Sequence, residues 1–262
     1  MRSGQPVPGD IAEAIQAARS RLGPLASSIA FYPTIGSTND VAAALATEGA
    51  VVIADEQTAG RGRRGRTWFS PPQSGLYVSV VLTPGRARVD PPRATTLLTL
   101  AAGVAIAEGI HASTGVSVDL KWPNDVYVSG RKLAGILAEA GRDVVVIGYG
   151  INLSAAAYPA ELRDRVTSLE SEIGRRIDRP QVLVDTLAAL AGRYADLLVG
   201  RFDAILDAWR ARAPAAAGCR VNWRDASRER SGVTAGIDNH GALLVQTGTG
   251  IERIVGGEVT WL

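Results

Sequence analysis

The spacing of apolar residues in the first part of the chain predicts helices and strands in alternation. In residues 10–22, Ile11 and Ile15 recur at helical spacing after Asp10, a residue that often caps helices, so we expect a short helix here. Runs rich in β-branched and aromatic residues predict strands at 28–33, 51–57 and 75–84, with an alanine-rich helix in 36–49.

A long helix and a second group of strands follow. Residues 92–113 are apolar around most of the helical circumference, which predicts a buried helix. Strands return in 116–130, interrupted at Pro123, and residues 131–141 and 143–152 predict a hairpin.

The last third of the chain changes from a helical to a strand pattern. Residues 181–212 carry a stripe of leucines at helical spacing, and a linker of small residues follows at 213–218. Short strands and tight turns, including "DNHG" at 238–241, then predict a small β-barrel. We therefore expect an α+β protein with a larger domain at 1–213, whose first 27 residues form a tail and short helix, and a small domain at 214–262.

Composition limits the kind of protein. A chain of 262 residues with 46% apolar content is long enough for one sizeable core and a small second domain. Its net charge of +2 does not suit a protein that coats nucleic acid. One cysteine, Cys219, excludes an intrachain disulfide, and two distant histidines give no metal-ligand spacing. We see no secretory signal and no run of about 18 apolar residues, so we expect a cytoplasmic protein that is not bound to a membrane.

The stretch "AGRGRRGRTW" at 59–68 is locally very basic, with four arginines and three glycines in residues 60–66. Its glycines match G-x-G-x-x-G, but a dinucleotide site needs a helix directly afterwards, and Pro71-Pro72 prevents one. Nucleic-acid binding by this stretch is disfavoured, because such binding would need further basic and aromatic residues spread over a surface. The remaining interpretation is a flexible loop that presents guanidinium groups to a phosphate or carboxylate.

The two lysines of the chain are also informative. Lys121 and Lys132 fall within the 12 residues "KWPNDVYVSGRK", although arginine supplies the positive charge elsewhere. Asp125 lies between them, and it suits Mg²⁺ binding, orientation of a lysine, or simple turn formation. Glycines at 135, 148 and 150 interrupt the predicted hairpin, which indicates either close approach of a ligand or backbone to that face, or strand twist and bulges.

Five motifs in order resemble the biotin protein ligases: "GSTN", "EQTAGRGRRGRTWFSP", "LKWPNDVYV", "GRKLAGILAE" and "GYGINL". They span residues 36–153, and "GIDNHGALLV" and "GGEV" resemble the small C-terminal domain of that family. The resemblance implies a mixed sheet like that of class II aminoacyl-tRNA synthetases, flanked by helices, followed by an SH3-like barrel. It also implies the use of ATP and Mg²⁺ to convert biotin to biotinyl-5'-AMP, and transfer of biotin to a lysine of a biotin carboxyl carrier protein.

The resemblance also assigns site residues. Lys132 and Arg61 are the implied catalytic residues, and Asp125 the Mg²⁺ ligand. The implied biotin site comprises Ser37, Thr38, Asn39, Gln57, Gly60, Arg61, Gly62, Arg63, Lys132, Gly135 and Gly148. The implied ATP and adenylate site comprises Arg63, Arg66, Trp68, Lys121, Lys132 and Asn152, with Trp68 stacked on adenine.

Two departures from the family pattern lead to further expectations. The segment before residue 28 has room for one helix only, so we expect ligase activity without the operator binding of relatives that carry a winged helix-turn-helix. The chain ends directly after "GGEVTW", so we expect no C-terminal contribution to nucleotide binding. A lipoate ligase or octanoyltransferase of the same superfamily, and a biotin-sensing regulator without transfer activity, are the alternatives. The sequence allows a monomer or a homodimer.

Overall fold

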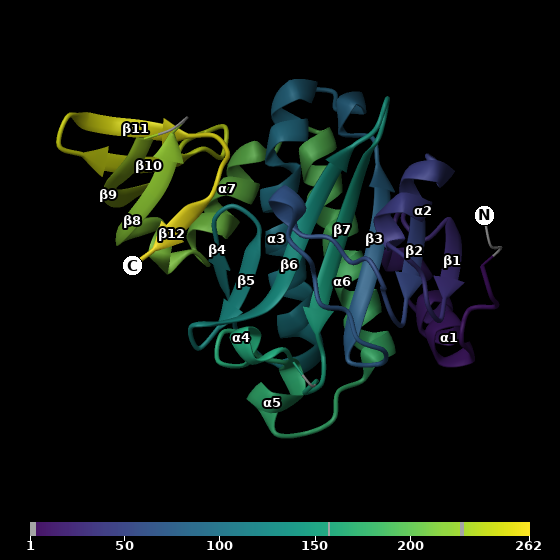
Figure 1. Cartoon of the computed structure of the whole chain (residues 1–262). Coiled ribbons are helices and arrows are strands. Elements are labelled where there is room, and N and C mark those ends of the chain that lie inside the picture. Colours follow the sequence, from purple (N-terminus) through teal and green to yellow (C-terminus); the bar gives the residue numbers. More distant parts are fainter. Residues whose placement is uncertain (1–3, 157, 226–227) are drawn as a thin grey trace.

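A mixed seven-stranded sheet forms the centre of the molecule (Figure 1). The computed structural model describes residues 4–156, 158–225 and 228–262. The strand order is β1-β2-β3-β7-β6-β5-β4, and only β1 and β2 pair in parallel among these strands. The strands are β1 (Ser28–Tyr32), β2 (Ala50–Ala54), β3 (Gly75–Leu82), β4 (Asp119–Lys121), β5 (Asp125–Val128), β6 (Arg131–Ala140) and β7 (Val145–Asn152). The mixed sheet expected from the sequence is confirmed.

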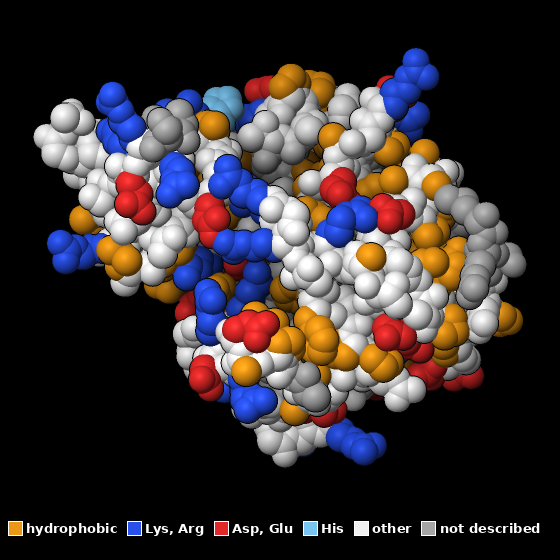
Figure 2. Space-filling view, in the orientation of Figure 1, with side chains coloured by type: hydrophobic (Ala, Val, Ile, Leu, Met, Phe, Trp, Pro, Cys, Tyr) orange, Lys and Arg blue, Asp and Glu red, His pale blue; other side chains and the backbone are white. Residues whose placement is uncertain are grey.

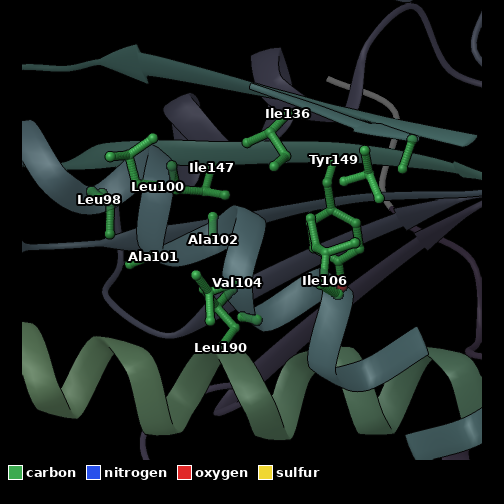
Figure 3. Packing of buried hydrophobic residues seen from close by; sticks show 14 of the residues in the cluster. Leu98, Leu100, Ala101, Ala102, Val104, Ile106, Ile136, Ile147, Tyr149 and Leu190 are labelled. Carbon is green, nitrogen blue, oxygen red and sulfur yellow. The ribbon is translucent and has the colours of Figure 1, made fainter. Parts of the chain in front are cut away.

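Helices cover the sheet. They are α1 (Gly9–Ala17), α2 (Thr38–Leu45), α3 (Pro91–Thr114), α4 (Ala160–Arg163), α5 (Leu169–Ile173), α6 (Arg179–Leu198) and α7 (Phe202–Arg210). Helix α3 lies between the sheet and α6, where its side chains meet Ile147 and Tyr149 on one side and Leu190 on the other (Figure 3). By length and composition alone α3 is apolar enough to cross a membrane, but most of it is buried in this core, which explains its apolar circumference.

Three elements differ from their sequence-based expectation. The helix expected at 181–212 is two helices, α6 and α7, separated at Gly200, whose φ of +79° is left-handed and ends α6. Helix α1 begins one residue before Asp10, and Pro8 takes the N-cap position, so Asp10 is not the cap; its carboxylate accepts from the neighbouring Ile11 N–H. Helices α4 and α5 were not expected.

The C-terminal residues form a second sheet, which is antiparallel and five-stranded. Its order is β11-β10-β9-β8-β12, from β8 (Ala217–Asp225), β9 (Arg228–Ile237), β10 (Leu243–Thr247), β11 (Gly250–Ile254) and β12 (Val259–Trp261). The turn between β9 and β10 is the predicted one, in which the Asp238 carboxylate accepts from the backbone N–H of His240 and Ala242. Trp122 Nε1 donates to Gly241 O at 2.9 Å, which joins this turn to the larger sheet.

Candidate functional site

A cavity of about 670 Å³ lies over the face of β5, β6 and β7. It is enclosed by residues 59–68, which we call the arginine loop, by residues 158–166 and by the C-terminal strand β12. Figure 2 shows Lys and Arg side chains gathered in the hollow between the C-terminal strands and the larger sheet. The cavity is lined by Ser37, Thr38, Asn39, Gln57, Arg61, Gly62, Arg63, Arg66, Trp68, Lys121, Asp125, Lys132, Gly135, Gly148 and Asn152, that is, by every predicted site residue except Gly60.

Sheet register explains how segments far apart in sequence meet in this cavity. Lys121 pairs with Asp125, Asp125 with Gly135, and Gly135 with Gly150, in one row across four strands. The Trp68 indole lies on this row: a Cβ built on Gly150 would be 2.2 Å from Trp68 Nε1. These glycines are therefore needed because a side chain, that of Trp68, packs directly on the sheet.

The next row of the sheet carries the polar end of the cavity. Gly148 pairs with Ser79, and the Asn39 amide lies on Gly148, where an added Cβ would be 2.1 Å from Asn39 Oδ1. Ser79 Oγ lies 2.5 Å from that oxygen, and Asn39 Nδ2 donates to Glu139 Oε2 at 2.6 Å. Both ends of the buried Asn39 amide are thus fixed by protein partners.

Thr38 and Gln57 extend this polar network. Gln57 Oε1 accepts from Thr38 N at 2.9 Å and from Thr38 Oγ1 at 3.0 Å, while Gln57 Nε2 donates to Ser70 Oγ at 3.1 Å. Thr38 Oγ1 also lies 2.7 Å from Ser79 Oγ, which joins the two halves of the network. Ser37 is buried beside them. Hydrogen bonds within the protein therefore hold these polar side chains in one arrangement.

Arg61 is paired with two carboxylates. Its guanidinium donates to Asp40 at 2.7 and 3.0 Å and to Glu139 at 3.0 and 3.3 Å. Hydrogen bonds from Arg61 to Asp40 and then to Glu139 raise its pKa above the usual arginine value. Arg61 thereby joins the arginine loop to α2 and to β6.

The rest of the arginine loop is a tight turn. Gly62 N donates to Arg66 O at 2.6 Å, and Trp68 N donates to Gly60 O at 2.9 Å. Gly60 packs against the opposite arm of the loop, where an added Cβ would be 2.5 Å from Trp68 O. Gly60 therefore permits the two arms to approach each other and does not face the cavity. Arg64 lies at its tip, with a left-handed φ of +59°.

The other two arginines of the loop have different surroundings. Arg66 forms an ion pair with Glu258 in the loop before β12. Arg63 is half-buried, and its side chain donates a long hydrogen bond of 3.4 Å to Asn124 Oδ1. Burial lowers the pKa of Arg63. The charge of Arg63 is therefore available to an anion, because no carboxylate of the described residues pairs with it directly.

Lys132 pairs with Asp125, since Nζ lies 2.6 Å from Asp125 Oδ1. The ammonium also lies 5.3 Å from the centre of the Trp68 ring, a cation–π distance. The backbone of Lys132 is held by residues 165 and 167, which run beside the start of β6. Trp68 Nε1 is buried and has no hydrogen-bond partner in the described part of the chain, so the indole has a free donor in the cavity.

Lys121 lies between two aromatic rings. Its Nζ is 4.8 Å from the centre of the Tyr127 ring and 5.4 Å from that of Trp261 in β12. Burial lowers the pKa of Lys121, and nearby Lys132 adds to this effect. Residues 257–261 line the cavity. Strand β12 therefore forms part of the cavity wall and brings an aromatic ring to Lys121. The expectation that the C-terminus makes no contribution to nucleotide binding stays a prediction.

Several residues of this site were missed by sequence reasoning. Ser79 is fully buried in an otherwise apolar strand, "LYVSVVL", and Glu139 is the acid in "LAGILAEA". An isolated polar residue in a buried strand is the signal that would have found Ser79. Glu139 lies in the partly exposed end of β6, where an acidic residue is not unusual. Asn152 lines the cavity but uses its Nδ2 to hold Thr167 O at 3.0 Å. No group of three metal-ligand residues occurs among the described residues, so a metal here would rest on Asp125 and on the oxygens of a ligand.

Comparisons with known proteins agree with this geometry. Residues 32–152 match the model of the biotin/lipoate A/B protein ligase family, and residues 218–260 match that of the biotin protein ligase C-terminal domain. The chain is 37% identical to the bifunctional ligase/repressor BirA of Bacillus spizizenii, over 87% of this chain and 72% of that protein. It is 36% identical to the biotin--[acetyl-CoA-carboxylase] ligase of Paracoccus denitrificans, over 85% of this chain and 96% of that protein.

A solved structure shares the fold. The biotin protein ligase of Aquifex aeolicus, in complex with biotin and ATP, matches with a TM-score of 0.78 and 29% identity. The match covers 90% of this chain and 99% of that one.

Proposed function

The chain belongs to the biotin protein ligase family, and we propose that it joins biotin to a lysine of a biotin carboxyl carrier protein at the expense of ATP. In the first step the biotin carboxylate attacks the α-phosphorus of ATP, which gives biotinyl-5'-AMP and pyrophosphate. In the second step the carrier lysine attacks the resulting mixed anhydride, which gives an amide and AMP.

The observation that carries the proposal is one cavity with a polar end and a cationic end. Thr38, Asn39 and Gln57 form the polar end, which suits the donors and acceptors of the biotin ureido group. Lys132, Arg63 and Lys121 form the cationic end, which suits a carboxylate and three phosphates. A molecule that lies along the cavity places its carboxylate near Lys132, where the phosphates of ATP meet it.

The roles of the cationic residues follow from this placement. Lys132 bridges the biotin carboxylate and the α-phosphate once it leaves Asp125, and Arg63 and Lys121 bind the phosphates. Arg66 and Asn152 contribute to nucleotide binding, and Trp68, with its free Nε1 donor, packs on the adenylate. Asp125 would hold Mg²⁺ together with phosphate oxygens, and the ion would neutralise charge on the triphosphate. Catalysis then rests on positioning and electrostatic stabilisation.

The second step requires no enzyme nucleophile, because the anhydride is already reactive. The described lining of the cavity contains no cysteine or histidine, which agrees with direct attack by the acceptor amine.

A lipoate ligase or octanoyltransferase is not favoured. Such enzymes bind an acyl chain that has no ureido group to match the polar end of the cavity. The hydrogen-bonded set of Thr38, Gln57, Ser79 and Asn39 would then face apolar atoms, which disfavours binding.

We further propose a catalytic domain at 1–213 and an SH3-like domain at 214–262, and activity in the cytoplasm as a monomer or homodimer. We propose no operator binding for the N-terminal segment, because residues 4–27 contain α1 and one 3₁₀ turn, whereas a helix-turn-helix module needs further helices.

The proposal is tested by following each step separately. With biotin and Mg²⁺-ATP, pyrophosphate release and bound biotinyl-5'-AMP are expected, and an apo carrier domain should then discharge the adenylate. Pyrophosphate release that does not depend on biotin, or an adenylate that no carrier discharges, would count against the proposal.

A further inference from the structure

A second cavity, of about 210 Å³, lies directly beside the main one. It is bounded by Thr96 and Thr99 of α3, by Ala138 of β6, and by His240 and Val255 of the C-terminal sheet. Nothing in the proposed reaction has so far used it.

The two cavities share a wall. Arg63, Trp122, Pro123, Asn124 and Ile136 line both of them. Asn124 directly precedes Asp125, the partner of Lys132, so the shared wall adjoins the cationic end of the main cavity. Among the described residues, the Arg63 side chain in this wall has one hydrogen bond, a long one of 3.4 Å to Asn124 Oδ1, and no carboxylate partner. Arg63 is therefore the residue of the shared wall that is least firmly held by polar contacts.

The second cavity suits a lysine side chain in shape and polarity. Leu100, Ile136 and Ala138 offer apolar contacts to a four-carbon stem, and Val255 is 78% exposed at the rim. Arg63, Arg253 and His240 are the ionisable groups that line it, and none of its described lining residues is acidic, although Arg253 forms an ion pair with Asp238 in the neighbouring turn. A lysine that enters meets the charge of Arg63, which no carboxylate pairs directly among the described residues; this charge lowers the pKa of the ammonium group and favours the neutral, nucleophilic amine.

The main cavity would already hold the adenylate when the acceptor lysine arrives. The ion pair of Arg66 and Glu258 joins the arginine loop to the segment before β12, and an adenylate would occupy the space beneath. A second route leaves these contacts in place during transfer.

We propose that the second cavity is the passage by which the acceptor lysine of the carrier domain reaches the mixed anhydride, an inference that rests on the proposed function. The lysine nitrogen attacks the carbonyl carbon of the anhydride. A C–N bond forms, the C–O bond to phosphate breaks, AMP leaves with the electron pair, and the proton of the nitrogen passes to solvent.

Thr96 and Thr95 offer a matched pair of variants. Both are exposed on the first turns of α3, and each hydroxyl donates to the carbonyl four residues before it, at 3.0 Å for Thr96 and 2.9 Å for Thr95. Only Thr96 lines the second cavity. Thr96→Trp should therefore block the passage, while Thr95→Trp makes the same change outside it.

The experiment measures the two steps separately in the full chain. Adenylate is formed from biotin and Mg²⁺-ATP, and its discharge is then timed with an apo carrier domain and with n-butylamine. Thr96→Trp should leave pyrophosphate release unchanged. It should slow discharge to both acceptors about tenfold or more, because the indole blocks the passage through which the amine reaches the carbonyl carbon. Thr95→Trp should discharge at the wild-type rate. Thr99→Leu narrows the same cavity and provides a second test of the passage if Thr96→Trp folds poorly.

Other outcomes overturn the passage. Equal rates for the two tryptophan variants would show that the cavity is not used. Slower discharge by the carrier with normal discharge by n-butylamine would make the cavity a docking patch instead. Failure of the wild-type chain to form biotinyl-5'-AMP would instead refute the proposed function, and it is seen before any acceptor is added.

Discussion

Glu139 is predicted to control biotin binding through Asn39. Its carboxylate accepts from Asn39 Nδ2 at 2.6 Å and from Arg61 at 3.0 Å. Glu139→Gln keeps the size of the side chain but removes its charge and adds an amide donor. The hydrogen bond from Asn39 Nδ2 then meets a neutral amide oxygen or the new NH₂ group instead of a carboxylate, which weakens the contact that fixes the Asn39 amide at the polar end of the cavity.

The magnitude follows from burial and charge. Hydrogen bonds to a charged group contribute roughly 1.5–3 kcal/mol, and neutral ones about 1 kcal/mol. Asn39 is 5% exposed, so water does not compensate for the weakened hydrogen bond, but the Glu139 side chain is 38% exposed, and solvent screening reduces the effect of its charge. We expect a loss of about 1.4 kcal/mol, which is about a tenfold rise in the Kd for biotin.

Titration calorimetry with biotin alone measures this effect, and Asp40→Asn is its control. Asp40 binds the same Arg61 guanidinium, but no hydrogen bond joins it to Asn39. Asp40→Asn should therefore change the Kd for biotin less than about twofold, since its exposed ion pair contributes little. The KM for ATP should stay the same in both variants.

Equal weakening of biotin binding by both variants would refute the reasoning, because the effect would then pass through Arg61. Unchanged biotin binding in Glu139→Gln would show that Asn39 does not depend on Glu139.

Three further predictions concern the cationic end and the glycine row. Lys132→Ala should slow adenylate formation about 10²–10³-fold in rapid-quench kinetics and change the Kd for biotin little, because the lost charge acts mainly on the charge that develops on the phosphate. An equal loss in the rate of adenylate formation and in the affinity for biotin would contradict a bridging role. Gly150→Ala should displace the Trp68 indole, since the new methyl carbon would lie 2.2 Å from Nε1, and a crystal structure with Trp68 unmoved would contradict this contact. Burial lowers the pKa of Lys121, so its charge is lost at a lower pH than usual as the pH rises, and the KM for ATP should increase in the alkaline range. Lys121→Arg should abolish that increase because arginine stays protonated, and an identical increase in the variant would exclude Lys121 as its source.

The elements that sequence predicted well are those with strong periodic patterns. Helix α3 and the hairpin of β6 and β7 match their expected ranges within about two residues. The break between α6 and α7 was missed because an isolated glycine in a helical pattern is often tolerated, and only the left-handed φ of Gly200 reveals the end of the helix. The short helices α4 and α5 carry too few residues for a clear period.

The sequence predicted which residues form the candidate site, but it did not predict which of them form hydrogen bonds or ion pairs with one another. Asn39 and Glu139 are 100 residues apart, and Arg61 and Glu139 are 78 apart. Such pairs depend on strand register and on the path of the arginine loop, which local patterns do not encode. The acids that bind Arg61 and Arg66 could therefore not be inferred from the motifs, whereas orientation of a lysine was one of the roles considered for Asp125, which pairs with Lys132.

The central claim is tested most directly by the intact mass of an apo carrier domain after incubation with the chain, Mg²⁺-ATP, and equal concentrations of biotin and lipoate. The account predicts one added biotinyl group, on one lysine, and none when ATP is omitted. A carrier that gains a lipoyl group, or gains no group while a known biotin ligase modifies the same carrier, would contradict it.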